Sequence, residues 1–381
     1  MKRLALLSVL ALVPAGAAFA DGCPPATCGM TSAAEPGSRI VVIRPHGQRG
    51  PALGYDVVAR RWRFSLPSGV VSANGATFVS TRHRQGRATT EVVRYDARAG
   101  RVRSRWSLGG RWAVGAVSPD GTGLALFDYR GHRTILRVGN PFSAQRLVLR
   151  GNYEVEALSP NGRRVFLVHW GRNGYDLQNL DLVTRKLAAT RLAEPDEKME
   201  GTALAGVATR DGRWLHTLYV KADGEGFVHA LDLVRGIAHC IDLPVRGDLA
   251  SYGATALALS PDERKLYLAS PVLGRVTTVD LERLRVSRVT ELAPLRRYTF
   301  GTGLGAAVNA NGRMLAFTLG SRLWLYDAAY GAVRRSVVAP YWIAGLGFVP
   351  DGKRVVAVGA GGAAAFFDAA TGKRVRGRAG G

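Results

Sequence analysis

Long apolar runs, cysteine and local catalytic motifs are all scarce in this sequence. No apolar run after residue 20 reaches the ~20 residues that a membrane-spanning helix needs, so we expect no span in the mature chain. Three cysteines allow one disulfide and leave one residue over. The sequence has no G-x-S-x-G, H-E-x-x-H, P-loop or C-x-x-C-H motif. An enzyme that gathers its site from distant residues remains open, but no motif favours it, and no cofactor is indicated.

The composition is that of a globular protein with a large core. Of the 381 residues, 47% are hydrophobic and 21% are charged. This length would ordinarily suggest two or more domains, but an internal repeat overrides that expectation.

A tetrapeptide of the type Ser-Pro-Asp-Gly recurs seven times. Its fourth positions are separated by 46, 41, 50, 51, 49 and 40 residues, a spacing typical of four-stranded propeller blades. The copies are Ser72-Ala73-Asn74-Gly75, Ser118-Pro119-Asp120-Gly121, Ser159-Pro160-Asn161-Gly162, Thr209-Arg210-Asp211-Gly212, Ser260-Pro261-Asp262-Glu263, Asn309-Ala310-Asn311-Gly312 and Val349-Pro350-Asp351-Gly352.

Each copy predicts a tight hairpin, because Asp-Gly or Asn-Gly supplies the positive-φ positions of such a turn. The strand that follows is apolar at successive positions, as in Val165-Phe166-Leu167-Val168 and Val355-Val356-Ala357-Val358. Such strands are buried on both faces, which a blade between two neighbouring blades provides.

A second repeat follows about 20 residues after the first and ends in aspartate. We expect this aspartate to cap the turn between the third and fourth strands by accepting hydrogen bonds from backbone amides. The second unit departs from the pattern with Gly139-Asn140-Pro141, so its hairpin should differ in shape. The copies are Tyr95-Asp96, Leu180-Asp181, Leu231-Asp232, Val279-Asp280, Tyr326-Asp327 and Phe367-Asp368.

Together, the two repeats resemble those of WD-type and YVTN-type bacterial β-propellers over residues 39–378. The resemblance implies an all-β fold, a β-propeller of four-stranded antiparallel blades. Counting the seven tetrapeptides, one for each blade, predicts a seven-bladed β-propeller. The resemblance implies no particular function, since such propellers serve many. Residues 39–67 contain further strands around Tyr55-Asp56, and we expect them to pair with the C-terminal blade and close the ring. Eight blades is the alternative.

Residues 1–20 have the pattern of a signal peptide. Lys2 and Arg3 precede the apolar run 4–13, and Ala18-Phe19-Ala20 forms a small-x-small cleavage site. We therefore expect an exported protein, secreted or associated with the cell envelope, although an uncleaved anchor is an alternative. Residues 21–38 have the composition of a flexible linker, in which Cys23 and Cys28 are expected to form a disulfide; pairing of one of them with Cys240 is the alternative.

The net charge is +23, and many arginines fall in the predicted fourth strands. A fourth strand is the exposed outer edge of a blade, where charge discourages edge-to-edge aggregation. Aromatic residues are not regularly interleaved with these arginines, which disfavours nucleic acid as the partner. A protein or an anionic envelope polymer fits better, and we expect a monomer.

The loops between strands two and three and between successive blades should share one face, where binding residues usually lie. The partner-facing residues predicted there are Arg82, His83, Asp128, Arg130, His132, His169, Trp170, Arg172, Glu197, Arg297, Tyr298, Tyr341 and Trp342.

Two sets of residues could carry other chemistry. Glu154 and Glu156 alternate on a predicted first strand, and paired carboxylates can do acid and base work or bind Ca²⁺. If the turns of the fourth repeat are tight, His229 lies opposite Cys240 with His216 nearly diagonal to it. Two imidazoles and a thiolate on one sheet face would suit zinc or copper, whereas a buried structural trio is the simpler interpretation.

The first function hypothesis is a secreted, non-catalytic propeller that acts as a binding or protein-interaction platform. The alternative is an exported hydrolase or lactonase with its site at the central channel. Carboxylates or histidines that converge at the channel would favour the enzyme, and an apolar channel would favour the platform.

Overall fold

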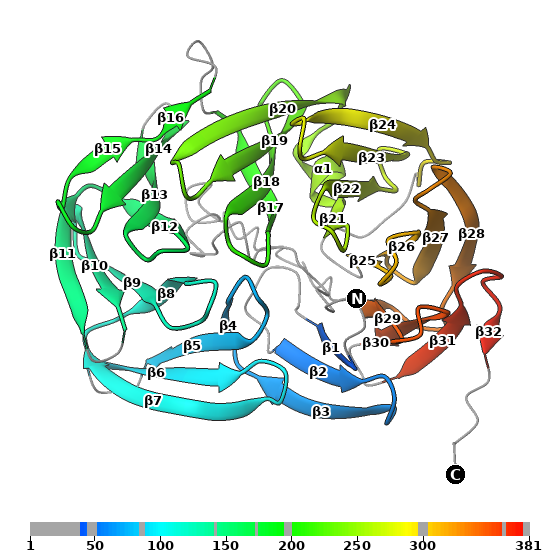
Figure 1. Ribbon diagram of the computed structural model, residues 1–381, viewed down its shortest axis with the longest axis horizontal. Helices are drawn as coiled ribbons and strands as arrows, with labels where there is room; N and C mark the ends of the chain where they lie inside the picture. Colours follow the sequence, from blue (N-terminus) through cyan, green and yellow to red (C-terminus); the bar gives the residue numbers. More distant parts are fainter. Residues whose placement is uncertain are drawn as a thin grey trace, which may run out of the picture.

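The computed structural model describes residues 39–43, 52–83, 88–140, 143–171, 174–193, 200–295, 304–359 and 363–375. The chain forms a ring of eight sheets, which we call blades 1 to 8 in chain order (Figure 1). Within each blade the first strand lies near the ring axis and the last lies at the rim, except that the first strand of blade 5, β16 (Arg191–Leu192), pairs in parallel with that blade's outermost strand. The fold is therefore all-β and a propeller, and of the two blade counts expected, eight is confirmed.

The strands of the first four blades have the following bounds. Blade 1 consists of β1 (Ile40–Ile43), β2 (Ala52–Asp56) and β3 (Arg61–Leu66). Blade 2 consists of β4 (Gly69–Val71), β5 (Thr77–His83), β6 (Thr89–Asp96) and β7 (Arg101–Gly109). Blade 3 consists of β8 (Ala113–Val117), β9 (Leu124–Tyr129), β10 (Arg133–Gly139) and β11 (Ala144–Arg150). Blade 4 consists of β12 (Tyr153–Leu158), β13 (Arg164–Gly171), β14 (Gly174–Asp181) and β15 (Leu187–Ala189).

The second half of the ring continues the pattern. Blade 5 consists of β16 (Arg191–Leu192), β17 (Thr202–Ala208), β18 (Trp214–Val220), β19 (Glu225–Asp232) and β20 (Ile237–Arg246). The helix α1 (Leu249–Gly253) leads into blade 6, which consists of β21 (Ala256–Leu259), β22 (Lys265–Ser270), β23 (Arg275–Asp280) and β24 (Arg285–Glu291). Blade 7 consists of β25 (Gly305–Val308), β26 (Met314–Leu319), β27 (Arg322–Asp327) and β28 (Ala332–Val338). Blade 8 consists of β29 (Ile343–Phe348), β30 (Arg354–Gly359), β31 (Ala364–Asp368) and β32 (Arg374–Val375).

Both repeats form the turns that were predicted. In the first repeat the hydroxyl of Ser118 donates to Asp120 Oδ1 at 2.5 Å, and Gly121 has a φ of 78°. In the second repeat Asp56 Oδ1 accepts from the amides of Val58 and Ala59. The same capping contacts recur at Asp96, Asp181, Asp232, Asp280, Asp327 and Asp368.

The hairpin that departs from the second repeat differs as expected. Asn140 Oδ1 accepts from the amide of Ser143, and Gly139 has a φ of 139°.

The expected closure of the ring by strand pairing is wrong. Among the described residues, β1 to β3 form hydrogen bonds with one another and make a blade of their own. This blade packs against blade 8 through side chains, with Val41 and Tyr55 in one buried cluster with Val356 and Phe366. Counting tetrapeptides missed blade 1 because none of the seven copies falls between its strands.

Apolar side chains between neighbouring blades form the core. The second strands are buried on both faces, as predicted: all four residues of Val165-Phe166-Leu167-Val168 are at most 4% exposed. Outer strands alternate instead, as in β7 and β28, with exposed arginines between half-buried apolar residues. Chemistry that reaches solvent therefore lies at the rim, on the loops and at the axis.

Candidate functional site

A group of polar contacts lies on the loop face where blade 2 meets blade 3. Arg130 Nε donates to Asp128 Oδ2 at 2.9 Å, and the Asp128 side chain is only 8% exposed. Gly110 lies beside this pair: a Cβ added to it would be 3.0 Å from Arg130 Nη2 and 3.1 Å from Trp112 Nε1. The ion pair and the indole thus surround a glycine whose φ of 108° itself disfavours a side chain.

A threonine ties the connection between these blades to the hairpin loop beside it. Thr90 Oγ1 donates to Gly110 O at 2.7 Å and accepts from the amide of Trp112 at 2.9 Å. His83 Nδ1 lies 2.9 Å from the same oxygen. Because the one hydroxyl proton of Thr90 goes to Gly110, His83 Nδ1 is the donor in this contact.

The same arrangement recurs between blades 3 and 4. Thr134 Oγ1 donates to Gly151 O and accepts from the amide of Tyr153, both at 2.8 Å. His169 stacks on Tyr153 with ring centroids 4.5 Å apart. Sequence reasoning missed these threonines and glycines, although Gly110-Arg111-Trp112 and Gly151-Asn152-Tyr153, each following an outer strand, were the available signal.

The predicted loop-face residues lie at separate places around the ring. Asp128 and Arg130 are in contact; Arg82 and His132 are exposed. Between blades 7 and 8, Tyr341 donates its hydroxyl to Ala357 O at 2.7 Å and its pKa is raised to about 12 by burial, while Trp342 is 52% exposed.

Several predictions fall outside what the structure describes. Arg172, Glu197, Arg297 and Tyr298, the Cys23–Cys28 disulfide and the signal peptide lie outside the described residues, as does the side chain of Trp170.

The predicted metal trio is only partly assembled. His229 pairs with Cys240 in the antiparallel register, as expected. His216, however, pairs with Ala230, so its side chain is on the opposite face of the sheet. The prediction that all three share one face is therefore wrong by one residue of register. In the described part of the chain, no group of three or more His, Cys, Asp and Glu side chains could hold a metal ion.

Both histidines are buried. His216 and His229 are each 1% exposed, and burial lowers the pKa of His216 to about 4 and that of His229 to about 3. Both imidazoles are therefore neutral at physiological pH.

Glu156 is buried between blades 4 and 5. It is 2% exposed, and its Oε2 has no hydrogen-bond partner among the described residues. Burial, and secondarily the charge of Glu154, raises the pKa of Glu156 to about 8. Burial chiefly raises the pKa of Tyr175 and Tyr219, and the charge of Glu156 adds to both shifts; the two rings stack with centroids 5.5 Å apart.

The axis of the ring is mainly apolar. The innermost strands β1, β4, β8, β12, β17, β21, β25 and β29 consist chiefly of Ala, Gly, Val, Leu and Ile. Glu154 and Glu156 are the only acidic or basic residues in these eight strands, and both belong to β12.

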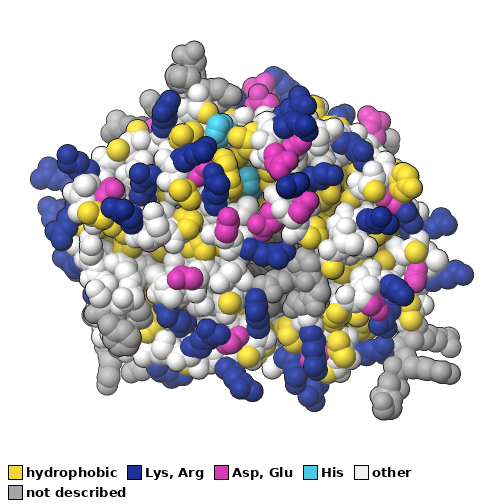
Figure 2. Space-filling model, viewed as in Figure 1, with side chains coloured by type: hydrophobic (Ala, Val, Ile, Leu, Met, Phe, Trp, Pro, Cys, Tyr) yellow, Lys and Arg dark blue, Asp and Glu magenta, His cyan; other side chains and the backbone are white. Residues whose placement is uncertain are grey.

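The rim carries most of the positive charge. Figure 2 shows Lys and Arg side chains projecting around the periphery and fewer acidic ones between them. Some arginines pair with the turn aspartate of their own blade, as Arg103 does with Asp96 at 2.6 Å. Others, such as Arg285 and Arg335, are exposed and form no ion pair within the described residues.

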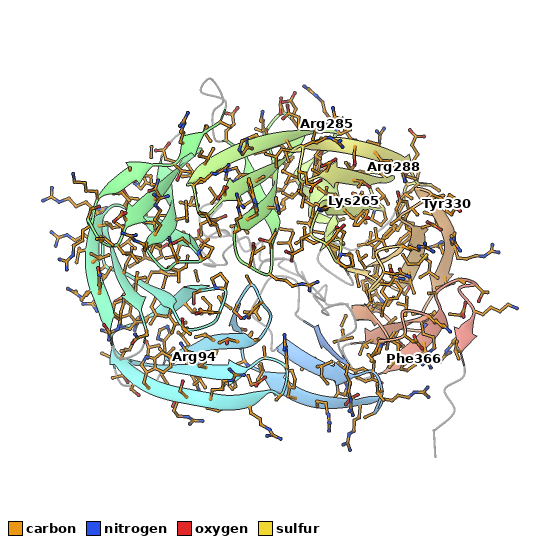
Figure 3. The ribbon with its side chains drawn as sticks, in the orientation of Figure 1. Arg94, Lys265, Arg285, Arg288, Tyr330 and Phe366 are labelled. Atoms are coloured by element: carbon orange, nitrogen blue, oxygen red, sulfur yellow. The ribbon has the colours of Figure 1, made fainter. Side chains whose placement is uncertain are left out.

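One basic surface spans blades 6 and 7. Arg288 Nη1 donates to Ala329 O at 3.2 Å, which joins β24 to the turn between β27 and β28. This turn presents Tyr330, 82% exposed, and Figure 3 shows it near Arg288, Arg285 and Lys265. Asp280 pairs with both Lys265 and Arg285 in the strand register and offsets part of their charge.

The described residues contain no helix with the length and apolar character needed to cross a bilayer.

No protein-family model matches the chain. Among curated proteins, the shikimate dehydrogenase (NADP(+)) of Rhodopseudomonas palustris strain TIE-1 is 34% identical over 88 residues, which are 23% of this chain and 31% of that protein. The shikimate dehydrogenase of Nitrobacter hamburgensis is 31% identical over 84 residues, 22% of this chain and 28% of that protein. The chain thus spans about a third of the length of these relatives, too little to assign a family.

A solved structure supports the fold. Dihydro-heme d1 dehydrogenase NirN has a TM-score of 0.53 and 16% identity, with 89% of this chain and 73% of that chain covered. The β-propeller domain of Cps50 (Swd1) from Myceliophteria thermophila has a TM-score of 0.43 and 15% identity, with 76% of this chain and 92% of that chain covered. At such low identity the likeness to NirN extends to the propeller fold alone. Membership of the WD-type or YVTN-type families stays a prediction.

Proposed function

We propose that this chain is an exported, non-catalytic binding platform whose loop face contacts a protein or an anionic polymer of the cell envelope. The observation that carries the proposal is the distribution of polar groups. The inner strands are apolar apart from one strand, whereas charged and aromatic side chains are exposed on the loops and rim. A rigid ring that presents its chemistry on peripheral loops suits recognition of a partner.

A hydrolase or lactonase at the axis finds less support. Acid and base catalysis needs groups that converge from different elements on one substrate. The two carboxylates of the described inner strands, Glu154 and Glu156, come from a single strand, and Glu156 is buried. The enzyme therefore remains the alternative function, and the experiment described next would also detect it.

The test uses two variants that remove the same charge from different surfaces. One replaces the loop residues Arg82 and Arg111 by glutamine, and the other replaces the rim residues Arg285 and Arg335 by glutamine. All four side chains are exposed. The tagged mature chain would be used to retain partners from its own envelope fraction at low and moderate salt.

The proposal predicts one partner that is retained at both salts, lost by the loop variant and kept by the rim variant. Equal loss by both variants, with binding abolished as salt rises, would mean that diffuse charge alone drives retention, because exposed charges are screened within about 10 Å at 0.1 M salt. If the tagged chain retains no partner and hydrolyses esters or lactones, the result would favour the enzyme.

A further inference from the structure

Glu156 occupies a position where the fold does not require a carboxylate. The inner strands of blades 3, 4, 5 and 8 each contain a β-bulge against the next strand, which leaves one extra residue in the inner strand. The extra residue is Gly115, Glu156, Leu204 and Ala344, respectively. Since glycine, leucine and alanine occupy the equivalent bulges, the geometry of the bulge does not explain why blade 4 has an acidic residue there.

The surroundings of Glu156 are polar although they are buried. On the face of blade 5 that packs against blade 4, Thr217 and His229 are at most 1% exposed. Thr217 Oγ1 and His229 Nε2, like Glu156 Oε2, have no hydrogen-bond partner in the described structure. Thr190 Oγ1, opposite Leu177 on the facing side of blade 4, is a fourth buried polar atom of this kind.

Aromatic side chains border this polar cluster. Tyr219 stacks on Phe227 at 5.3 Å and meets His229 edge-on at 5.9 Å. The interface also contains Tyr175 and, half-buried, Cys240. Among the described residues, the titratable groups that interact with Glu156 are Glu154 on β12, Tyr175 on β14 and Tyr219 on β18. His229 on β19 and Cys240 on β20 lie on the same blade interface, whereas His216 is on the far face of its sheet and Tyr129 on β9 lies toward Glu154.

None of these neighbours supplies a positive charge, because His229 is neutral and the others are neutral or acidic. An ionised carboxylate without a cation or sufficient donors is costly in a buried site, whereas the protonated acid is far less so. We propose that Glu156 is a buried proton-binding site. It holds a proton at neutral pH and releases it to water in mildly alkaline solution, and its ionisation weakens the packing of blade 4 against blade 5.

The direct test is infrared spectroscopy of the full chain as a function of pH. At pH 7 ordinary aspartates and glutamates are ionised, so a C=O band of a protonated carboxyl group reports a group such as Glu156. The proposal predicts that this band is present at pH 7 and disappears with a midpoint near pH 8. It also predicts that the band is absent in Glu156→Gln. In the matched control Glu154→Gln the band should still be present at pH 7, with a lower midpoint because the charge of Glu154 no longer raises the pKa of Glu156.

Amide hydrogen exchange tests the consequence for packing. After correction for the intrinsic effect of pH, exchange in β12 and β18 should accelerate between pH 7 and pH 9, while exchange in β26 of blade 7 should not. Glu156→Leu, which places at this bulge the residue type found at Leu204, should abolish the acceleration and still fold.

Absence of the protonated carboxyl band from the wild type at pH 7, or its persistence in Glu156→Gln, would overturn the proposal. A normal band without any local change in exchange would refute the coupling to the blade interface.

Discussion

The interface between blades 7 and 8 and the interface between blades 4 and 5 have the same architecture but different chemistry. The first is built from side chains such as Leu325, Leu346 and Phe367. The second combines a similar apolar set with Glu156 and His229. Since both interfaces close with the same strand order, apolar packing suffices for the fold, and the polar groups of the second are an addition to it.

The largest expected effect tests whether apolar packing carries both interfaces. Leu325 in blade 7 and Leu231 in blade 5 are fully buried. Replacing either by alanine should lower the free energy of unfolding by ~2–5 kcal/mol, because each change removes buried methyl groups and leaves a cavity. Denaturant unfolding at pH 6.5 would measure both. A much smaller loss for Leu231→Ala would show that the polar interface is held by other contacts.

The second prediction concerns pH and separates the interfaces. The unfolded chain loses the Glu156 proton near its ordinary pKa of 4.5, whereas the folded chain holds it to about pH 8, so stability falls as pH rises through this window. His216 and His229 act in the opposite sense: their lowered pKa values mean that the unfolded chain binds more protons below pH 6.5, and stability falls as pH drops toward 3.

These three groups together place the stability maximum near pH 6.5. Between pH 6.5 and 8 the wild type should lose about 2 kcal/mol through Glu156, from 1.36 kcal/mol per pKa unit. Glu156→Leu should remove this alkaline loss, and Glu154→Gln should keep it. Denaturant unfolding would measure the free energy of unfolding of each variant at pH 6.5 and at pH 8. An equal loss in the wild type and in Glu156→Leu would mean that groups other than Glu156 cause the pH dependence.

The smallest effect compares the aspartate turns of the same two regions. Asp327 in blade 7 has a 5% exposed side chain, caps two amides and pairs with Arg334, whereas Asp181 in blade 4 caps two amides in a more open turn. Asp327→Ala should therefore cost ~1 kcal/mol more than Asp181→Ala, because it also removes the ion pair with Arg334. Thermal unfolding of the two variants, with Tyr330→Ala as an exposed control, would measure the difference.

Local chemistry made the turns predictable. A serine, an asparagine or aspartate and a glycine bond to one another within four residues, so the geometry around Ser118 and Asp120 follows from adjacent residues alone. The capping role of Asp56 and its equivalents is local for the same reason. Strands buried on both faces could likewise be recognised from uninterrupted apolar runs.

The candidate sites were less predictable because they depend on register and on contacts between blades. His216 was assigned to the wrong sheet face, since a shift of one residue reverses the direction of a side chain. The link from Thr90 to Gly110 joins residues 20 positions apart, and nothing local marks Thr90 as its donor. Glu156 is likewise buried by residues of blade 5, and the spacing of residues within β12 gives no information about that contact.

The sequence by itself determined the repeat, its two turns, the all-β propeller and the arginine-rich outer strands, because each is set by residues within one hairpin. Tertiary structure decided that blade 1 stands alone and packs against blade 8, that His216 and His229 face different neighbours, and that a carboxylate lies buried between blades 4 and 5. These outcomes depend on which blade packs against which face, and the free energy of burial is set by both partners together.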